Sequence, residues 1–249
     1  MNKRLKIYGE RNTGTNYISK LIALNLEVEQ LSGVVPDFLL RLCKYLPGDE
    51  WLRDLYFLLS FGSNLGWKHA KVKPAEEIDA LITGCSEICF ITLTKNPYSW
   101  LLSLHHRHYH QKYLAEPNFE TFLLTPWKTS SRENCKTMLK SPIELWNLKN
   151  ASYLQLPPHR SLNLKTESIL LSPESVIEKI ASTFAVERTS TTFINYEQST
   201  KDNKKDFSYY QNYYLRELWR EKLSEESISI INQNLDSELM DHYGYCFIL

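Results

Sequence analysis

The chain has 249 residues, 43% of them hydrophobic and 23% charged, which is ordinary for a globular protein with a sizeable core. Its 29 basic and 29 acidic residues leave no net charge. A protein that binds duplex nucleic acid usually has a basic excess, because it neutralises phosphates. We therefore expect no nucleic-acid partner, and any phosphate site must be local.

Neither the N-terminus nor any later window predicts membrane insertion. The basic residues at the start are not followed by a long apolar stretch, so a signal peptide is not indicated. The apolar stretch from Leu52 to Phe61 is too short for a membrane span and contains Arg53 and Asp54. We therefore expect a cytoplasmic protein with no integral membrane segment. The cysteines are odd in number and scattered, which predicts reduced thiols: Cys43, Cys85, Cys89, Cys135 and Cys246.

The first elements are a strand, a loop and a helix. Leu5 to Tyr8 is apolar-rich and ends at Gly9, as a strand does before a turn. Thr15 to Leu26 has apolar residues near helical spacing. Asp37 to Ser60 also looks helical, with a break at Pro47-Gly48. We expect residues 37–61 to be a helical insertion after the first helix.

The middle of the chain alternates short strands with helices. Gly66 to His69 predicts a short second strand, and Pro74 to Leu81 begins like a helix, with proline in the first turn. Glu87 to Leu93 is the clearest buried strand. The turn at Asn96-Pro97 starts a helix that we expect to continue to about Tyr113.

The second half continues this alternation. Ser161 to Lys165 alternates leucine with polar residues, as a strand does. Strands that alternate with helices predict an α/β fold with a central parallel β-sheet flanked by helices, here as a single domain over residues 1–249. Ligands of such sheets bind at the carboxyl ends of the strands. The expected helices are Phe119 to Leu124, Pro142 to Leu156, Pro173 to Phe184 and most of Leu215 to Leu249.

The loop after the first strand predicts a phosphate site. Gly9 and Gly14 have the glycine spacing of a nucleotide-binding P-loop, and backbone N–H groups at a helix start favour anions. Thr15 stands where a P-loop has its lysine, and Arg11 supplies a basic residue earlier instead. The loop is P-loop-like but argues against ATP hydrolysis. The alternative is a glycine turn before an ordinary helix.

A second basic position follows the clearest strand. Lys95 lies at its carboxyl end, and Ser103 falls one to two turns into the next helix. A cation and a hydroxyl that converge there can hold a second phosphate. Alone, Lys95 reads as a solvated loop lysine, and its significance comes from its occurrence together with the first loop.

With both motifs in place, the chain resembles the sulfotransferases that use 3′-phosphoadenosine-5′-phosphosulfate (PAPS). Arg11 to Asn16 is similar to the loop that holds the 5′-phosphosulfate. Lys95 to Tyr98 with Ser103 resembles the 3′-phosphate motif, usually an arginine with a serine eight residues on. Trp67-Lys68-His69 is similar to the strand with the catalytic histidine, and Glu167 takes the family's acidic position. Two positions depart from the pattern: Asn12 replaces a lysine and Lys95 replaces the arginine.

The resemblance implies transfer of a sulfuryl group from PAPS to a hydroxyl acceptor, a small molecule or a glycan, with a saccharide mildly favoured. His69 is the expected general base, with Glu10 as its rival, and Arg11 stabilises the leaving group. In a strand, Lys68 and His69 would point to opposite faces, so only one could meet the ligand. No metal is chemically required. The residues expected to bind the donor are Arg11, Asn12, Thr13, Gly14, Thr15, Asn16, Lys95, Ser103, Lys204 and Lys205.

Two other functions remain open at this stage. A P-loop nucleotide kinase would need the missing lysine and ligands for Mg²⁺, and a non-catalytic nucleotide-binding protein of the same fold needs only the loop. The sequence indicates no oligomeric state. It predicts an exposed helix surface, rather than a metal site, for the histidine cluster His105, His106, His108 and His110.

Overall fold

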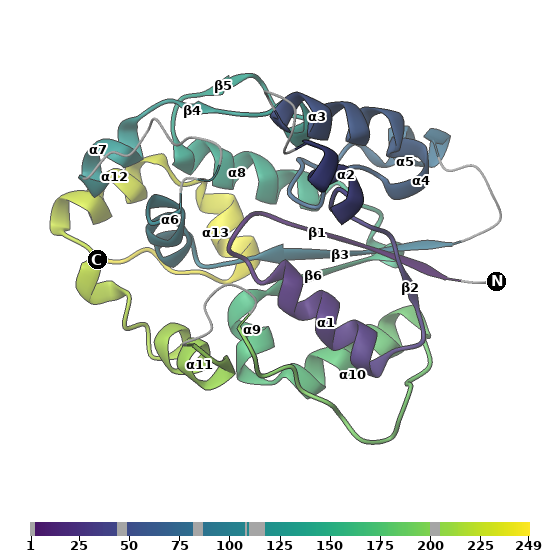
Figure 1. Ribbon diagram of the computed structural model, residues 1–249. Coiled ribbons are helices and arrows are strands. Elements are labelled where there is room, and N and C mark those ends of the chain that lie inside the picture. The colour runs from purple at the N-terminus through teal and green to yellow at the C-terminus, as the bar shows by residue number, and fades with distance from the viewer. Residues whose placement is uncertain (1–2, 44–48, 82–86, 108, 110–117, 200–204) are drawn as a thin grey trace.

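The structure is a computed structural model that describes residues 3–43, 49–81, 87–107, 109, 118–199 and 205–249. Its centre is a sheet of four parallel strands in the order β2 (Glu29–Gln30), β1 (Arg4–Gly9), β3 (Ile88–Thr94) and β6 (Ser161–Lys165) (Figure 1). The predicted α/β fold with a central parallel sheet is therefore confirmed.

Helices cover both faces of this sheet (Figure 1). Alternate residues of a strand face opposite sides, and β1 follows this rule. On one face, Ile7 packs in an apolar cluster with side chains of α1 (Thr15–Asn25) and α10 (Pro173–Phe184). On the other face, Tyr8 packs in a second cluster with Phe90. Side chains on both faces are buried, which explains the nearly continuous apolar character of β3.

A third apolar cluster fills the space between helices beside the sheet. Trp100, Trp127 and Trp146 are almost fully buried in it. The helix predicted from Pro97 to Tyr113 ends at His105, and Tyr109 has a positive φ of 56° that no helix contains. The helices of this cluster are α6 (Pro97–His105), α7 (Phe119–Leu124), α8 (Pro142–Tyr153), α12 (Glu225–Asn234) and α13 (Ser237–Tyr243).

The remaining elements are short. Helices occupy the described part of the segment predicted as an insertion, and the C-terminal region is helical as far as Tyr243. None of the described helices has the length and apolar character needed to cross a bilayer. These elements are α2 (Asp37–Cys43), α3 (Asp49–Leu59), α4 (Phe61–Asn64), α5 (Ala75–Leu81), α9 (Thr166–Leu171), α11 (Phe207–Leu215), the hairpin of β4 (Trp127–Lys128) and β5 (Met138–Leu139), and the 3₁₀ turns η1 (Ser131–Glu133), η2 (Pro158–Arg160) and η3 (Arg220–Lys222).

The strand predicted over Gly66 to His69 is wrong, since these residues form a turn. Leu65 and Gly66 have φ values of 59° and 81°, in the left-handed region that interrupts an extended chain. The second strand of the sheet is β2 instead. It is only two residues long, so it has too little alternation to be recognised in the sequence.

Lys6 in β1 fixes the position of this turn through side-chain hydrogen bonds. Its side chain is fully buried, and Nζ donates hydrogen bonds to the carbonyl oxygens of Asn64 and Gly66, both at 2.5 Å. Burial, helped by the nearby Lys68 charge, lowers the pKa of Lys6 to about 7. The position of the turn therefore depends on a lysine that titrates near neutral pH.

We expect Lys6 to make stability depend on pH. Its pKa is about 7 in the folded protein against an ordinary value of 10.5, so the unfolded state binds the extra proton between these values. The free energy of unfolding should therefore rise with pH across that window, by at most about 1.4 kcal/mol per pH unit. Urea unfolding at pH 7, 8 and 9 measures this slope. Lys6→Met should flatten it and the exposed control Lys140→Met should not. Equal slopes in all three proteins would contradict the assignment.

Candidate functional site

The loop from Glu10 to Gly14 joins β1 to α1 at the carboxyl edge of the sheet. Gly14 begins α1 with φ 82° and Asn12 has φ 67°, so the chain turns sharply before the helix. The first N–H groups of an α-helix have no partner inside it, and the helix dipole adds positive potential there. The N-terminus of α1, at Thr15 and Asn16, is therefore suited to an anion, as the sequence predicts.

Side-chain hydroxyls hold this loop in place. Thr166 Oγ1, at the start of α9, donates to the carbonyl oxygens of Thr13 and Thr94, both at 2.9 Å. Thr13 turns inward, since its N–H and its hydroxyl both donate to the Glu10 carbonyl. A Cβ on Gly9 would lie 2.9 Å from the Leu93 and Thr15 side chains, so glycine is required there by close packing.

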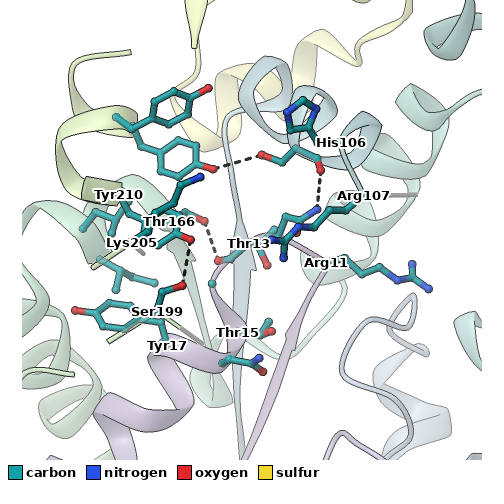
Figure 2. Close-up of a pocket in the computed structure, with 18 of the residues that line it drawn as sticks. Arg11, Thr13, Thr15, Tyr17, His106, Arg107, Thr166, Ser199, Lys205 and Tyr210 are labelled. Carbon is teal, nitrogen blue, oxygen red and sulfur yellow. Dashed lines mark hydrogen bonds between the residues drawn. The ribbon is translucent and has the colours of Figure 1, made fainter. Parts of the chain in front are cut away.

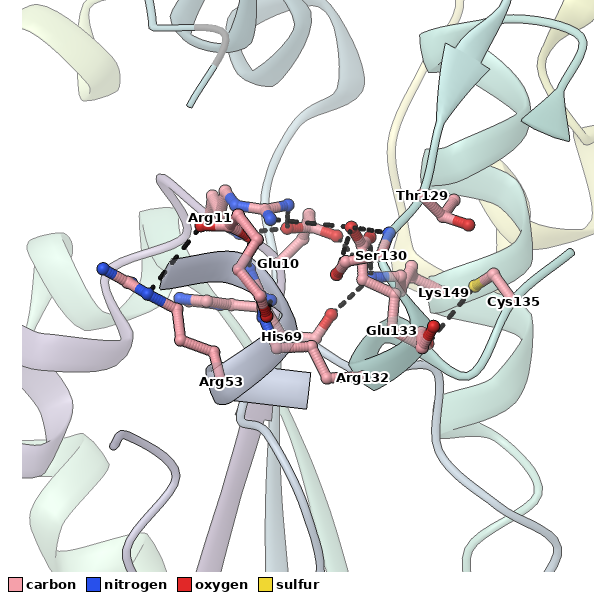
Figure 3. A network of polar contacts seen from close by, with 12 residues as sticks. Glu10, Arg11, Arg53, His69, Thr129, Ser130, Arg132, Glu133, Cys135 and Lys149 are labelled. Carbon is pink, nitrogen blue, oxygen red and sulfur yellow. Dashed lines mark hydrogen bonds and ion pairs between the residues drawn. The ribbon is translucent and has the colours of Figure 1, made fainter. Parts of the chain in front are cut away.

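Four buried charges meet at this loop, two from Glu10 and Arg11 in the loop itself and two from Glu133 and Lys149 (Figure 3). Glu10 accepts from Arg11 at 3.2 Å and from Lys149 at 2.7 Å, and Glu133 lies 3.0 Å from Lys149 and 3.6 Å from Arg11. All four side chains are 3% exposed or less. Burial alone lowers the pKa of Arg11 and Lys149, but the two carboxylates outweigh it and raise both pKa values. Two positive and two negative charges thus compensate one another.

This network changes the reading of two predicted residues. Glu10 does not line the pocket described below, because both of its carboxylate oxygens are engaged with Arg11 and Lys149. Of its two predicted alternatives, the arrangement favours holding Arg11 over acting as a base. Arg11 does line the pocket, and its guanidinium lies 4.6 Å from the Trp67 ring centroid and 5.0 Å from that of Tyr109.

His69 is held in one tautomer. Its Nδ1 lies 2.5 Å from the Gly9 carbonyl oxygen, which can only accept, so Nδ1 carries the proton and Nε2 the lone pair. Burial and the positive charges of Arg11 and Lys68 lower the pKa of His69 well below its ordinary value, against the opposing effect of the Gly9 hydrogen bond. The imidazole is therefore neutral at neutral pH and has the form that a general base requires.

Lys68 lies in the same pocket as His69. The prediction that only one of them could face the ligand holds for a strand and does not apply here, because these residues form a turn. Lys68 Nζ donates to Asn16 Oδ1 at 2.5 Å, at the start of α1. Burial lowers the pKa of Lys68. It brings a cation to the helix start, where the sequence has no P-loop lysine.

Lys95 and Ser103 meet as their spacing predicts. Lys95 Nζ donates to Ser103 Oγ at 3.0 Å, but Lys95 is fully buried and does not line the pocket. Asn12 bridges the two motifs, donating to the Ser103 carbonyl at 3.2 Å and accepting from the Tyr109 hydroxyl at 2.7 Å. The aromatic ring of Tyr214 covers Lys95, with its centroid 3.8 Å from Nζ.

The pocket at this edge has a volume of about 780 Å³, in the range of small-molecule sites. Figure 2 shows Thr13 and Thr166 in its middle, Arg11 and His106 on one side, and Tyr210 with Lys205 on the other. Lys204 lies outside the described residues. Among the described residues that line the pocket, Glu197 is the one carboxylate, and the basic side chains are Arg11, Arg53, Lys68, Arg107, Lys205 and Lys222.

The described part of the histidine cluster has two environments. His106 is exposed at the pocket, whereas His105 packs against the rings of Phe119 and Phe122, so the predicted exposed surface is wrong for His105. His108 and His110 lie outside the described residues. No group of three or more potential metal ligands occurs among those that are described.

Comparison with solved structures agrees with this architecture. The sulfotransferase domain from the Synechococcus PCC 7002 olefin synthase matches with a TM-score of 0.51 and 12% identity, over 100% of this chain and 96% of that chain. The protein has a sulfotransferase fold. Two weaker matches are the sulfotransferase domain from the curacin biosynthetic pathway (TM-score 0.47, 14% identity, 100% and 99% covered) and a sulfotransferase from Alicyclobacillus acidocaldarius (0.38, 12%, 96% and 99%). No protein-family model and no curated protein sequence matches the chain.

Several residues of the site have no signal in the sequence. Glu133 and Lys149 come from η1 and α8, more than a hundred residues after the loop. Tyr214 lies in an aromatic run that looks like a packed helix, and Lys68 was set aside on the assumption of a strand. Only three-dimensional proximity identifies them, because no local pattern distinguishes them from other residues of their type.

We expect Lys149 to be essential for the buried network. Lys149→Met keeps the length of the side chain but leaves Glu10 and Glu133 buried without their shared cation, which should cost about 3–5 kcal/mol of unfolding free energy. Urea unfolding measures this loss, with the exposed Lys140→Met as the control. A loss below about 1 kcal/mol, typical of a surface pair, would show that the network is not a stabilising unit.

Proposed function

We propose that the protein is a sulfotransferase that moves a sulfuryl group from PAPS to a hydroxyl acceptor. The observation that carries the proposal is the juxtaposition of His69 and the α1 N-terminus in one pocket. The histidine has an unprotonated Nε2, and the helix start is suited to an anion. The sulfotransferase fold supports it.

In this proposal the donor spans the two predicted motifs. The backbone N–H groups at the start of α1, with the side chains of Thr15 and Asn16, hold the 5′-phosphosulfate. Lys68 takes the role of the mobile cation beside the leaving phosphate, since the Arg11 guanidinium is already engaged by two carboxylates. Lys95 and Ser103 bind the 3′-phosphate, and Lys205 lies at the same pocket.

The reaction follows from this placement. The acceptor hydroxyl gives its proton to His69 Nε2 while its oxygen attacks sulfur. The bond between sulfur and the 5′-phosphate oxygen breaks in line, and the electron pair stays on the phosphate. The helix N-terminus and the Lys68 ammonium stabilise the charge that develops there. The products are a sulfate ester and 3′-phosphoadenosine-5′-phosphate, and His69 returns its proton to solvent.

The acceptor in this proposal is a small molecule or glycan that presents its hydroxyl to His69. The Trp67 ring lies 5.0 Å from the His69 ring, and Trp67 and Tyr109 both line the pocket, so aromatic side chains border the base. Aromatic side chains are common partners of a sugar or a phenol. A saccharide hydroxyl is therefore our preferred acceptor class.

We expect 3′-phosphoadenosine-5′-phosphate to stabilise the protein. A ligand at a hundred times its dissociation constant adds about 2.7 kcal/mol, which raises Tm by roughly 5–11 °C at this chain length. ADP should give less, because it lacks the 3′-phosphate, and Lys95→Ala should abolish the difference. Differential scanning fluorimetry measures these shifts. Stabilisation by ATP–Mg²⁺ alone would favour the nucleotide kinase, and no shift with any nucleotide would favour a protein that keeps the fold without the donor site.

Removal of the base should separate catalysis from binding. His69→Ala should lower kcat by about 10²-fold or more, because the proposal assigns the hydroxyl proton to His69 Nε2. The Kd of 3′-phosphoadenosine-5′-phosphate should stay within about twofold, since the histidine faces the acceptor. Transfer of labelled sulfate from PAPS to a panel of glycans and phenols provides the rate. An unchanged rate would exclude His69 as the base.

A further inference from the structure

Tyr214 of α11 stands between Lys95 and the pocket. Its ring lies over the Lys95 ammonium at 3.8 Å from the centroid, and its hydroxyl is 3.4 Å from Ser103 Oγ. Tyr214 and Ser103 line the pocket, whereas Lys95 behind them is fully buried. A ligand in the pocket therefore meets the phenol of Tyr214 before it can reach the lysine.

The Lys95 ammonium has no anionic partner within the described part of the chain. Its polar contacts there are neutral, namely Ser103 Oγ and the Tyr214 phenol. The Ser103 hydroxyl accepts from Lys95 and donates its own proton to the Ser99 carbonyl oxygen at 2.8 Å, so it carries no charge that could compensate the ammonium. A buried cation is costly unless an anion compensates it. The Lys95 charge therefore favours a further negative group beside it.

The Tyr214 hydroxyl lies where such a group would bind. Burial and the Glu167 charge raise the pKa of Tyr214, but the Lys95 charge and the hydrogen bonds of Lys95 and Ser103 outweigh them and lower the pKa. The phenol oxygen therefore occupies a position where negative charge is favoured. An arriving phosphate oxygen would approach the same Lys95 ammonium, so ligand and phenol compete for it.

We infer that Tyr214 is a specificity-determining residue whose phenol holds the place of the 3′-phosphate and must leave Lys95 and Ser103 before that phosphate binds. This inference rests on the proposed function, which assigns the 3′-phosphate to these two residues. The affinity for a 3′-phosphorylated nucleotide is reduced by the fraction of molecules in which the phenol is displaced. A nucleotide with only a 5′-phosphate uses the α1 N-terminus and leaves Tyr214 in place.

Calorimetric titration with 3′-phosphoadenosine-5′-phosphate and with adenosine 5′-monophosphate tests this. The ratio of the two Kd values measures how much the 3′-phosphate contributes to affinity. Tyr214→Ala should bind the 3′-phosphorylated nucleotide about five- to tenfold more tightly and the monophosphate unchanged. Tyr214→Phe, which keeps the ring over Lys95 and loses only the hydroxyl, should give a smaller gain and guards against misfolding of the alanine variant. Lys95→Met added to Tyr214→Ala should bring the ratio close to one.

The control is Tyr56→Ala, which removes a partly buried tyrosine ring of α3 that does not line the pocket, and its ratio should equal that of the wild type. An unchanged or weakened affinity for the 3′-phosphorylated nucleotide in both Tyr214 variants would overturn the inference alone, provided that the wild type prefers this nucleotide to the monophosphate. If neither the wild type nor Tyr214→Ala discriminates between the two, the assignment of the 3′-phosphate to Lys95 fails, and the proposed function with it.

Discussion

The geometry of the site depends on four buried charges that compensate one another, those of Glu10, Arg11, Glu133 and Lys149. Lys149 donates to both carboxylates and also to the His69 carbonyl oxygen, so one ammonium joins the phosphate loop, η1 and the turn that carries the histidine. Buried ion pairs contribute little net stability compared with apolar packing. Here the ion pairs serve to fix positions. Each of the four charged groups is low in energy only when it lies beside its partners, so the segments that carry them are held together.

The charge of this protein is distributed unevenly. The chain as a whole is neutral, yet basic side chains outnumber acidic ones in the described lining of the pocket. Burial and the positive charges of Arg11 and Lys68 keep the His69 imidazole unprotonated. The same charges would repel an imidazolium, so they keep the Nε2 lone pair available but weaken its basicity.

The fold was predictable because its strongest signals are periodic. β1 and β3 were recognised from apolar runs, β6 from the alternation of leucine with polar residues, and the loop of Gly9 to Gly14 from glycine spacing before a helix. The Lys95–Ser103 contact followed from a spacing of eight residues across a strand end. Periodicity could not reveal a two-residue strand such as β2 or the left-handed turn at Leu65 and Gly66. Nor could it show that Lys95 lies beneath Tyr214, since that cover comes from a helix more than a hundred residues later.

Trp67 links the segment of α2 to α4 to the site. Its ring centroid lies 4.6 Å from the guanidinium of Arg11 in the loop, and at the same distance from that of Arg132, which is ion-paired with Glu50 and Asp54 of α3. Helices that lie between two strands of a sheet can usually be exchanged without effect on the rest of the fold. In this chain these helices cannot be exchanged freely. A change in α3 would break the ion pairs of Arg132, and Arg132 is one of the two arginines that contact the Trp67 ring. Movement of Trp67 would in turn disturb His69, two residues later in the chain. Exchange of this segment would therefore be constrained to variants that preserve the arginine–tryptophan contacts.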